Sequence, residues 1–173
     1  MRFVPLMKRR LRLANKMALE ISRASAADIP RLTDLLLQVH LVHSSKRPDI
    51  FRPGSKKYTE CELREIIDDG TRPILVAKDG GVTVGYAFTV LEEVKDDKSL
   101  TDRRTLYLDD LCVDEKRRGE HIGEALYRAV RELARELGCY QVTLNVWTLN
   151  DGAMRFYEKQ GLKPLKVVME DII

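Results

Sequence analysis

The stretch Leu108 to Gly123 (LDDLCVDEKRRGEHIG) decides the fold of this chain of 173 residues. It consists of an apolar β-type run, three consecutive cations and the glycine-containing start of a long helix. A helix N-terminus exposes unpaired backbone N–H groups and the positive end of the helix dipole, so this junction favours an anion. Gly119 lets the backbone approach a ligand closely, whereas Gly123 costs about 1 kcal/mol relative to alanine in a helix. The junction therefore predicts a phosphate site, and the alternative is a basic surface turn.

The strands before this junction are marked by composition and turn chemistry. Two β-rich runs, 73–78 and 82–94, are joined by Asp79-Gly80-Gly81, which predicts an antiparallel hairpin. The next strand, expected over 106–113, loses its alternation at Asp109-Asp110. Such a slip indicates a β-bulge or burial on both faces.

The helix after the junction has the clearest pattern in the chain. From Ile122 the apolar residues recur at offsets 0, 3, 4, 7, 8, 11 and 15, and Gly138 marks its end. The remaining elements are a strand over 19–23, a helix from the N-cap Ser25 to about His43, a helix over 58–67, a strand over 142–147, a helix over 151–159 capped by Asn150 or Asp151, and a closing strand over 165–172. The order predicts one α/β domain over residues 19–173, with helices on both faces of a single mixed sheet.

The charge of the chain is concentrated at its start. The net charge is +3, but residues 1–16 hold six cations and no acid, which leaves 24 cations against 27 acids from Met17 onward. Residues 1–18 are therefore expected to form a basic extension outside the folded domain, which need not be ordered. It could be a nucleic-acid or membrane-surface arm, a targeting segment, or residues upstream of a start at Met17, and we favour the last.

Cysteine and histidine usage bears on the compartment and on metals. Cys61, Cys112 and Cys139 are an odd number without a C-x-x-C pair, which favours a reducing, cytoplasmic setting with small buried thiols. His40 and His43 form an H-x-x-H pair at most, which is too little to predict a metal site. No apolar run approaches the roughly 18 residues of a membrane-spanning helix, so a soluble globular protein is expected.

Two motifs connect these elements to a known family. The run Arg118-Gly119-Glu120-His121-Ile122-Gly123 resembles the R-x-x-G-x-G/A signature of the GCN5-related N-acetyltransferases (GNAT). Residues 150–162 (NDGAMRFYEKQGL) resemble that family's N-x-x-A-x-x-F-Y-E-K-x-G-F. His121 replaces the usual first glycine, and a positive φ there would strain a histidine by about 1 kcal/mol. Leu162 in place of phenylalanine is a benign change.

The resemblance implies a mostly antiparallel sheet whose strands splay apart at a site for acetyl-CoA. The diphosphate would take the backbone N–H groups of 118–123, and the pantetheine arm would pair with the strand around Leu111 to Val113 as an added strand does. The implied cofactor-binding residues are Leu111, Cys112, Val113, Arg117, Arg118, Gly119, Glu120, His121, Ile122, Gly123, Glu124, Asn150, Ala153 and Tyr157.

The implied reaction is attack of a neutral primary amine on the thioester. Tyr157 matches the family's general acid, which protonates the departing thiolate. Asp109 is our choice of general base, and because adjacent strand residues point to opposite faces, only one of Asp109 and Asp110 should reach the site. Asn145, one strand over, could orient a substrate or a water but cannot act as a base.

The acceptor is expected to be the amine of a small molecule or peptide. By position, His40, Phe51, Tyr86 and Asn145 would line its pocket, and five cations in 44–57 favour an acceptor carrying an anionic group, so we lean towards an amino-acid-like amine. The main alternative is a non-catalytic acyl-CoA sensor or docking module with the same fold. The chain shows no recognition helix of a nucleic-acid binder, and it has only two of the three glycines of a dinucleotide-binding fingerprint. The family resemblance also makes a homodimer possible, because homodimers are frequent in the family.

Overall fold

The computed structural model describes residues 19–173, so the basic extension predicted over residues 1–18 lies outside the described part. The elements in chain order are β1 (Glu20–Arg23), a 3-10 turn (Ala26–Asp28), α1 (Ile29–Ser44), α2 (Glu60–Asp68), β2 (Ile74–Asp79), β3 (Val82–Val94), β4 (Arg103–Val113), a second 3-10 turn (Glu115–Arg117), α3 (Ile122–Glu136), β5 (Gln141–Leu144) and α4 (Asp151–Lys159). No described helix is long and apolar enough to cross a bilayer.

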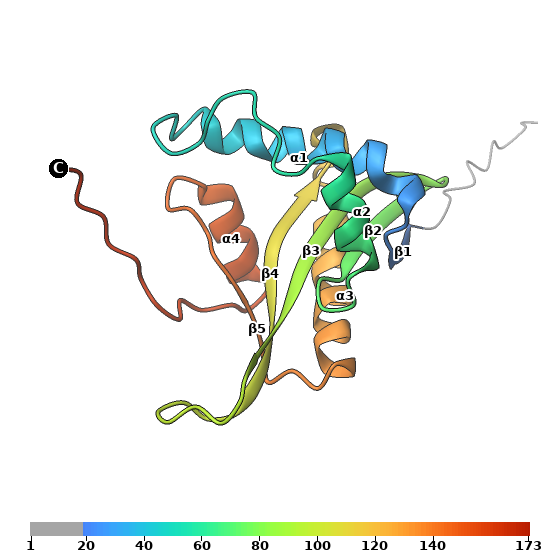
Figure 1. The fold of residues 1–173 in the computed structure, drawn as a ribbon. Coiled ribbons are helices and arrows are strands. Elements are labelled where there is room, and N and C mark those ends of the chain that lie inside the picture. Colours follow the sequence, from blue (N-terminus) through green and yellow to red (C-terminus); the bar gives the residue numbers. More distant parts are fainter. Residues whose placement is uncertain (1–18) are drawn as a thin grey trace, which may run out of the picture.

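The five strands form one sheet in the order β1-β2-β3-β4-β5. The first three pairs are antiparallel, and β4 pairs with β5 in parallel, which confirms the predicted mixed and mostly antiparallel sheet. Helices α1 and α2 cover one face, and α3 covers the other (Figure 1). The turn between β2 and β3 is made by Gly80 and Gly81 with positive φ, as the hairpin signal predicts.

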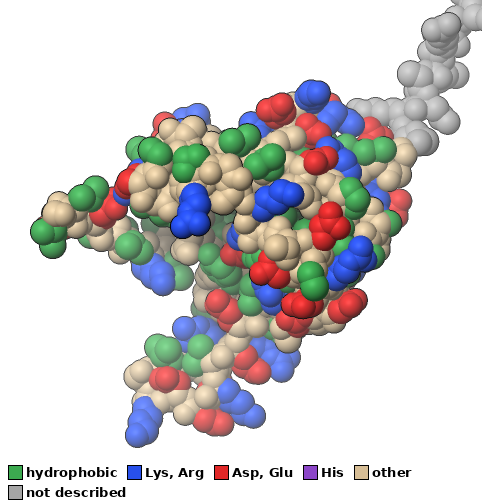
Figure 2. All heavy atoms as spheres, turned by 45° about the horizontal axis from the view of Figure 1, so that its top comes forward, with side chains coloured by type: hydrophobic (Ala, Val, Ile, Leu, Met, Phe, Trp, Pro, Cys, Tyr) green, Lys and Arg blue, Asp and Glu red, His purple; other side chains and the backbone are tan. Residues whose placement is uncertain are grey.

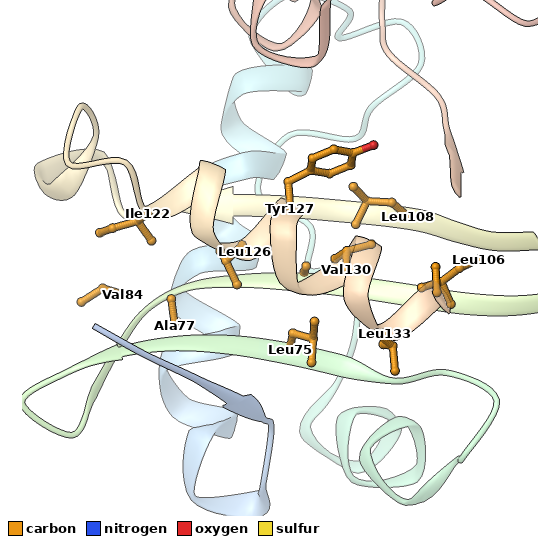
Figure 3. Packing of buried hydrophobic residues seen from close by; sticks show 12 residues of the cluster. Leu75, Ala77, Val84, Leu106, Leu108, Ile122, Leu126, Tyr127, Val130 and Leu133 are labelled. Carbon is orange, nitrogen blue, oxygen red and sulfur yellow. The ribbon is translucent and has the colours of Figure 1, made fainter. Parts of the chain in front are cut away.

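Helix α3 buries its apolar stripe against the sheet. Leu126 and Val130 are fully buried, and Figure 3 shows Leu126 and Leu133 directed towards the strands that carry Ala77 and Leu75. Across the sheet, Leu32 and the other apolar residues of α1 and α2 form a second cluster with β-strand side chains. Two packed faces hold β3 and β4 rigidly, and the candidate site is built on these strands.

The expected bulge lies in β4. The pairing of β3 with β4 shifts between Phe88 and Thr89, so that Phe88 opposes Asp110 and Thr89 opposes Leu108. Asp109 is the extra residue. An extra residue bends the strand and changes which way the neighbouring side chains point.

The end of the chain differs from the prediction. The strand expected over 142–147 ends at Leu144, and residues 165–172, predicted to close the sheet, form no strand or helix. The apolar, β-favouring composition of this segment is real, but a strand forms only by pairing with another strand, and residues 165–172 pair with no strand of the described chain. Figure 1 shows it running away from the sheet.

The cysteines only partly follow expectation. All three are free thiols, but only Cys112 is buried, Cys139 is partly buried and Cys61 is exposed on α2. Helical periodicity places Leu63 and Ile66 of α2 in the core, so the position of Cys61 falls on the solvent side.

Candidate functional site

The start of α3 is open to a ligand. Gly119 and His121 have φ of +84° and +61°, so the turn before the helix uses left-handed conformations, and the strain expected at His121 is present. No side chain caps the helix, whose first backbone bond is donated by Ala125 to the His121 carbonyl at 3.1 Å. The N–H groups of Ile122, Gly123 and Glu124 therefore lack helical acceptors. These groups and the helix dipole favour an anion.

The outer edge of β4 is free beside this corner. Parallel pairing with β5 covers only Thr105 to Leu108, and the two strands separate beyond this point, as the family resemblance implies. The Asp114 N–H donates to the Val84 carbonyl of β3 at 2.9 Å. Backbone groups alternate between the two edges of a strand, so those of Leu111 and Val113 point away from β3, towards the free edge. A peptide-like ligand can pair there.

The third strand residue of the predicted set points elsewhere. The Cys112 thiol is buried on the α1 face, 3.5 Å from the Leu35 carbonyl oxygen, and burial raises its pKa to about 12. Its side chain therefore cannot contact a ligand at the free edge.

Gly123 has a packing role that the sequence did not reveal. A Cβ added there would lie 3.4 Å from a ring carbon of Phe156 on α4 and 3.7 Å from Val113. Glycine thus lets α4 approach the first turn of α3. Gly85 has a similar role on β3, because a Cβ there would lie 2.9 Å from the Cys112 carbonyl oxygen.

The cations of the corner are used in different ways. The Arg117 guanidinium lies 2.7 Å from Asp79 and 2.8 Å from Glu120, so it holds the turn against the β2–β3 hairpin. Arg118 is exposed, and its Nε lies 3.4 Å from the Val113 carbonyl oxygen. Of these two arginines, Arg118 is the one beside the free edge.

Both aspartates of the bulge lie on one side of the sheet. Lys57, from the loop after α1, places its Nζ 2.9 Å from Asp109 and 3.7 Å from Asp110. The two side chains therefore do not point to opposite faces as expected, because the bulge cancels the alternation. The Tyr86 hydroxyl donates to Asp110 at 3.1 Å.

The two carboxylates differ in exposure. The Asp110 side chain is 12% exposed and that of Asp109 27%. Burial raises the pKa of Asp110 to about 6, although the Lys57 charge opposes this. One reachable carboxylate thus lies beside one that is nearly enclosed.

Tyr157 lies on α4, partly buried against Phe156 and Tyr127, with ring centroids 5.0 and 6.1 Å away. No described residue hydrogen-bonds its hydroxyl. Burial, and then the negative charge of Asp110, raise the pKa of Tyr157 above its usual range. The phenol is thus kept protonated and is electrostatically coupled to the bulge of β4.

The first turn of α4 is capped by the side chain of Asn150, the residue before the helix. The Asn150 side-chain oxygen accepts the Ala153 N–H at 3.2 Å, which confirms the predicted cap. Glu124 of α3 accepts from His121 at 3.0 Å and pairs with Lys159 of α4 at 3.1 Å. Asn150, Ala153 and Glu124 therefore serve to hold the two helices in place.

The residues expected around the acceptor separate into two groups. The Phe51 ring stacks on the His43 ring, with the centroids 5.1 Å apart, and lies edge-on to the Trp147 ring, with the centroids 5.0 Å apart. This aromatic group lines a small hollow between the loop after α1 and the loop before α4. His40 is not among the lining residues; its ring lies edge-on to Phe51 with the centroids 6.2 Å apart, and its Nε2 lies 2.8 Å from the Arg52 carbonyl oxygen.

The second group lies at the sheet. Asn145 donates to the Tyr107 hydroxyl at 3.0 Å and is exposed. Tyr86 is fully buried, so it cannot line a pocket as predicted and acts through Asp110. Sequence reasoning missed the roles of two residues. Lys57 lies in an irregular loop, and Trp147 was expected at the end of a strand but lies in the loop before α4.

Comparison with known proteins gives a consistent result. The chain matches the acetyltransferase (GNAT) family over residues 40–162. It is 30% identical over 139 residues to thialysine N-epsilon-acetyltransferase from Bos taurus, a match that covers 80% of this chain and 73% of the relative. A solved mutant of the BH1408 protein from Bacillus halodurans has a TM-score of 0.86 and 28% identity, covering 89% of this chain and 99% of that one.

A more distant structure shares the fold alone. Aminoglycoside N-acetyltransferase AAC(6')-Iy, solved in complex with CoA, has a TM-score of 0.68 at 13% identity, covering 90% of this chain and 95% of that one. The family match spans both motifs and the splayed strands on which the site is built. The chain therefore belongs to the acetyltransferase (GNAT) family, and it is an N-acetyltransferase.

Proposed function

We propose that this enzyme transfers the acetyl group of acetyl-CoA to the primary amine of a small, amino-acid-like molecule or a peptide. The observation that carries the proposal is the free edge of β4 beside the uncapped start of α3. A ligand that uses both features needs a peptide-like arm joined to a diphosphate, and CoA has this combination. When bound, acetyl-CoA supplies a thioester as the acetyl donor.

The residues present fit this ligand. The backbone groups of Leu111 and Val113 would pair with the pantetheine arm, and the N–H groups of Ile122 to Glu124 would bind the diphosphate. Arg118 would add a charge-assisted contact, because its guanidinium is exposed beside the corner. Arg117 would act indirectly, by fixing the turn through Asp79.

The acceptor amine would enter on the side of the bulge. Asp109 and Asp110 offer two carboxylates that already hold the Lys57 ammonium, so the chemistry of this place suits an alkylammonium group. Three of the five cations in 44–57 already have partners. Besides Lys57, Arg47 is ion-paired with Asp49 and Glu170, and Lys46 donates to the Leu149 carbonyl. The loop therefore offers less free positive charge to an anionic acceptor than its composition indicates. An amino-acid-like amine agrees with the substrate in the name of the bovine relative.

Each step of the reaction has a candidate group. Asp109, the more exposed carboxylate, takes a proton from the bound alkylammonium. This group has a pKa of about 10.4 and must be deprotonated before its nitrogen can attack. Burial, and then the negative charge of Asp110, raise the pKa of Tyr157 and keep it protonated. As the new C–N bond forms and the C–S bond breaks, Tyr157 would donate its phenolic proton to the departing sulfur and take back the proton that the acylated nitrogen loses. Asn145 and the Tyr107 hydroxyl orient the acceptor.

We also propose that residues 19–173 form a single catalytic domain, and that the enzyme works in the cytoplasm, where its three free thiols would stay reduced.

Thiol release from acetyl-CoA tests the proposal. The purified chain is mixed with acetyl-CoA and, in turn, thialysine, lysine, a polyamine and an aminoglycoside, while acetyl-CoA binding is measured separately by calorimetry. We expect acetyl-CoA to bind and thialysine or lysine to give the fastest release. Failure to bind acetyl-CoA, or release that no amine accelerates, would overturn the proposed reaction, whereas a faster polyamine would overturn only the choice of acceptor.

A further inference from the structure

The loop after α1 places a lysine of this chain at the proposed acceptor site. The Lys57 Nζ lies 2.9 Å from Asp109 and 3.7 Å from Asp110. A pantetheine arm that starts from the diphosphate at α3 and pairs with Val113 and then Leu111 would end beside these aspartates, because they are the next residues of β4. The Lys57 ammonium therefore lies close to the place where the nitrogen of the acceptor must meet the thioester.

Lys57 is held in this position as a cation. The Tyr58 hydroxyl donates at 3.4 Å to Oδ2 of Asp109, the same oxygen that accepts from Lys57, and the Lys57 Nζ lies 5.4 Å from the centroid of the Tyr58 ring. Burial lowers the pKa of Lys57, but the charges of Asp110 and Asp109 and the hydrogen bond to Asp109 outweigh it, so the pKa is raised. The acceptor site thus contains a positive charge of its own.

The charges at this site leave room for one further ammonium group. Burial raises the pKa of Asp110 to about 6, so both carboxylates are ionised at about pH 8, and Lys57 neutralises one of the two negative charges. No described residue hydrogen-bonds Oδ1 of Asp109, so this oxygen is open to the acceptor. One negative charge remains for the amine that reacts.

A second positive charge on the acceptor would meet cations. The central carbon of the Arg72 guanidinium lies 6.0 Å from the centroid of the Tyr58 ring, so Arg72 adds to the positive charge of Lys57 on this side. Figure 2 shows acidic and basic side chains interspersed over the face that α1 forms, not gathered into one acidic surface. Like charges brought together at a binding site disfavour the wrong partner.

We propose that Lys57 selects the acceptor by charge: by neutralising one of the two carboxylates it admits an amine with a single net positive charge, such as lysine or thialysine, and rejects polyamines. The inference rests on the proposed acetyl transfer and names the residue that decides which amine takes part. Discrimination of this kind comes from a repulsive group placed against the competitor.

Charge variants of Lys57 in the full chain test the proposal. Lys57→Gln and Lys57→Met remove the charge, Lys57→Arg keeps it, and Lys56→Gln removes the charge of the exposed neighbour as a matched control. In thiol-release assays at about pH 8, kcat/KM for spermidine should rise at least tenfold in the two neutral variants, mainly through KM, while kcat/KM for lysine changes less. Lys57→Arg and Lys56→Gln should keep the wild-type ratio of the two amines.

Calorimetry gives a second readout that needs no turnover. Lysine and spermidine are titrated into each variant in the presence of CoA, which has no acetyl group to transfer. Spermidine should bind at least tenfold more tightly to the neutral variants than to the wild type. The Lys57 side chain is 35% exposed, so the circular dichroism spectra of all variants should match.

The two readouts separate this inference from the proposed reaction. A wild type that acetylates no amine would overturn the reaction, and the calorimetric ratio of the two amines would still decide the role of Lys57. Neutral variants that keep the wild-type ratio would overturn the charge selection, as would an equal shift in Lys56→Gln. So would a loss of selectivity in Lys57→Arg as large as in Lys57→Gln, because the shape of the side chain would then matter and not its charge.

Discussion

The two halves of the sheet differ in how they are covered. The covered half, β1 to β4 with α1, α2 and α3, holds every buried residue of the described chain, and none after Ala134 is buried. The open half, β5 with α4 and residues 163–173, holds Tyr157. The covered half supplies stability, and the open half leaves room for ligands. The candidate site lies along the seam between them, where β4 leaves β5.

The largest expected effect breaks the chemistry in the open half. Tyr157→Phe should lower kcat/KM about 1000-fold, because the general acid is lost, and this equals about 4 kcal/mol of transition-state free energy. The affinity for acetyl-CoA and the free energy of unfolding should change little. Steady-state thiol release and calorimetry measure both. Tyr127→Phe, on the neighbouring ring, is the matched control and should stay active; equal losses in both variants would contradict the assignment.

A substitution in the covered half should have the opposite profile. Leu126 is fully buried, and Leu126→Ala should lower the free energy of unfolding by about 3 kcal/mol through lost packing and a residual cavity. Leu149→Ala in the open half, where the side chain is 50% exposed, should cost less than about 1 kcal/mol. Urea denaturation compares the two variants. Similar losses would mean that the halves do not differ as described.

Asp110 lies on the seam and should couple stability to pH. Its pKa of about 6 in the folded protein is above the unfolded value of 3.8, so the folded state binds more protons between them. Stability from this group is present below about pH 4 and is lost as pH rises through 6. Asp110→Asn should remove that slope and stabilise the protein at pH 8 by about 2 kcal/mol.

Asp109→Asn is the matched control for that prediction. It should leave the free energy of unfolding within about 1 kcal/mol, because its pair with Lys57 is partly exposed. Thiol release at neutral pH should fall at least tenfold, by our assignment of the base, and the rate of Asp110→Asn should change less. A larger rate loss in Asp110→Asn would exchange the two roles.

The smallest effect concerns the turn before α3. His121→Gly should raise the free energy of unfolding by about 1 kcal/mol, because glycine adopts the left-handed conformation without strain. Gly119→Ala should lower it by a similar amount, since a Cβ there meets no atom within 4 Å and only the backbone conformation matters. Thermal melting curves of both variants measure this. A shift of the same sign in both would contradict the explanation.

Local patterns predicted the features that depend on neighbouring residues. The sequence predicted four such features, because each is a short-range preference of the backbone: the helix from Ile122, the glycine turn between β2 and β3, the Asn150 cap and the bulge at Asp109-Asp110. The two motifs also placed the chain in its family. These features define where a ligand can bind.

Only the tertiary structure decided which side chains meet. The sequence could not show that Lys57 pairs with both aspartates, that Tyr86 is buried behind Asp110, or that Gly123 makes room for Phe156. It predicted a closing strand over 165–172 from composition, but this segment pairs with no strand of the described chain. Contacts between distant segments are set by how the whole chain packs, and a β-favouring segment has no structure of its own until another strand pairs with it.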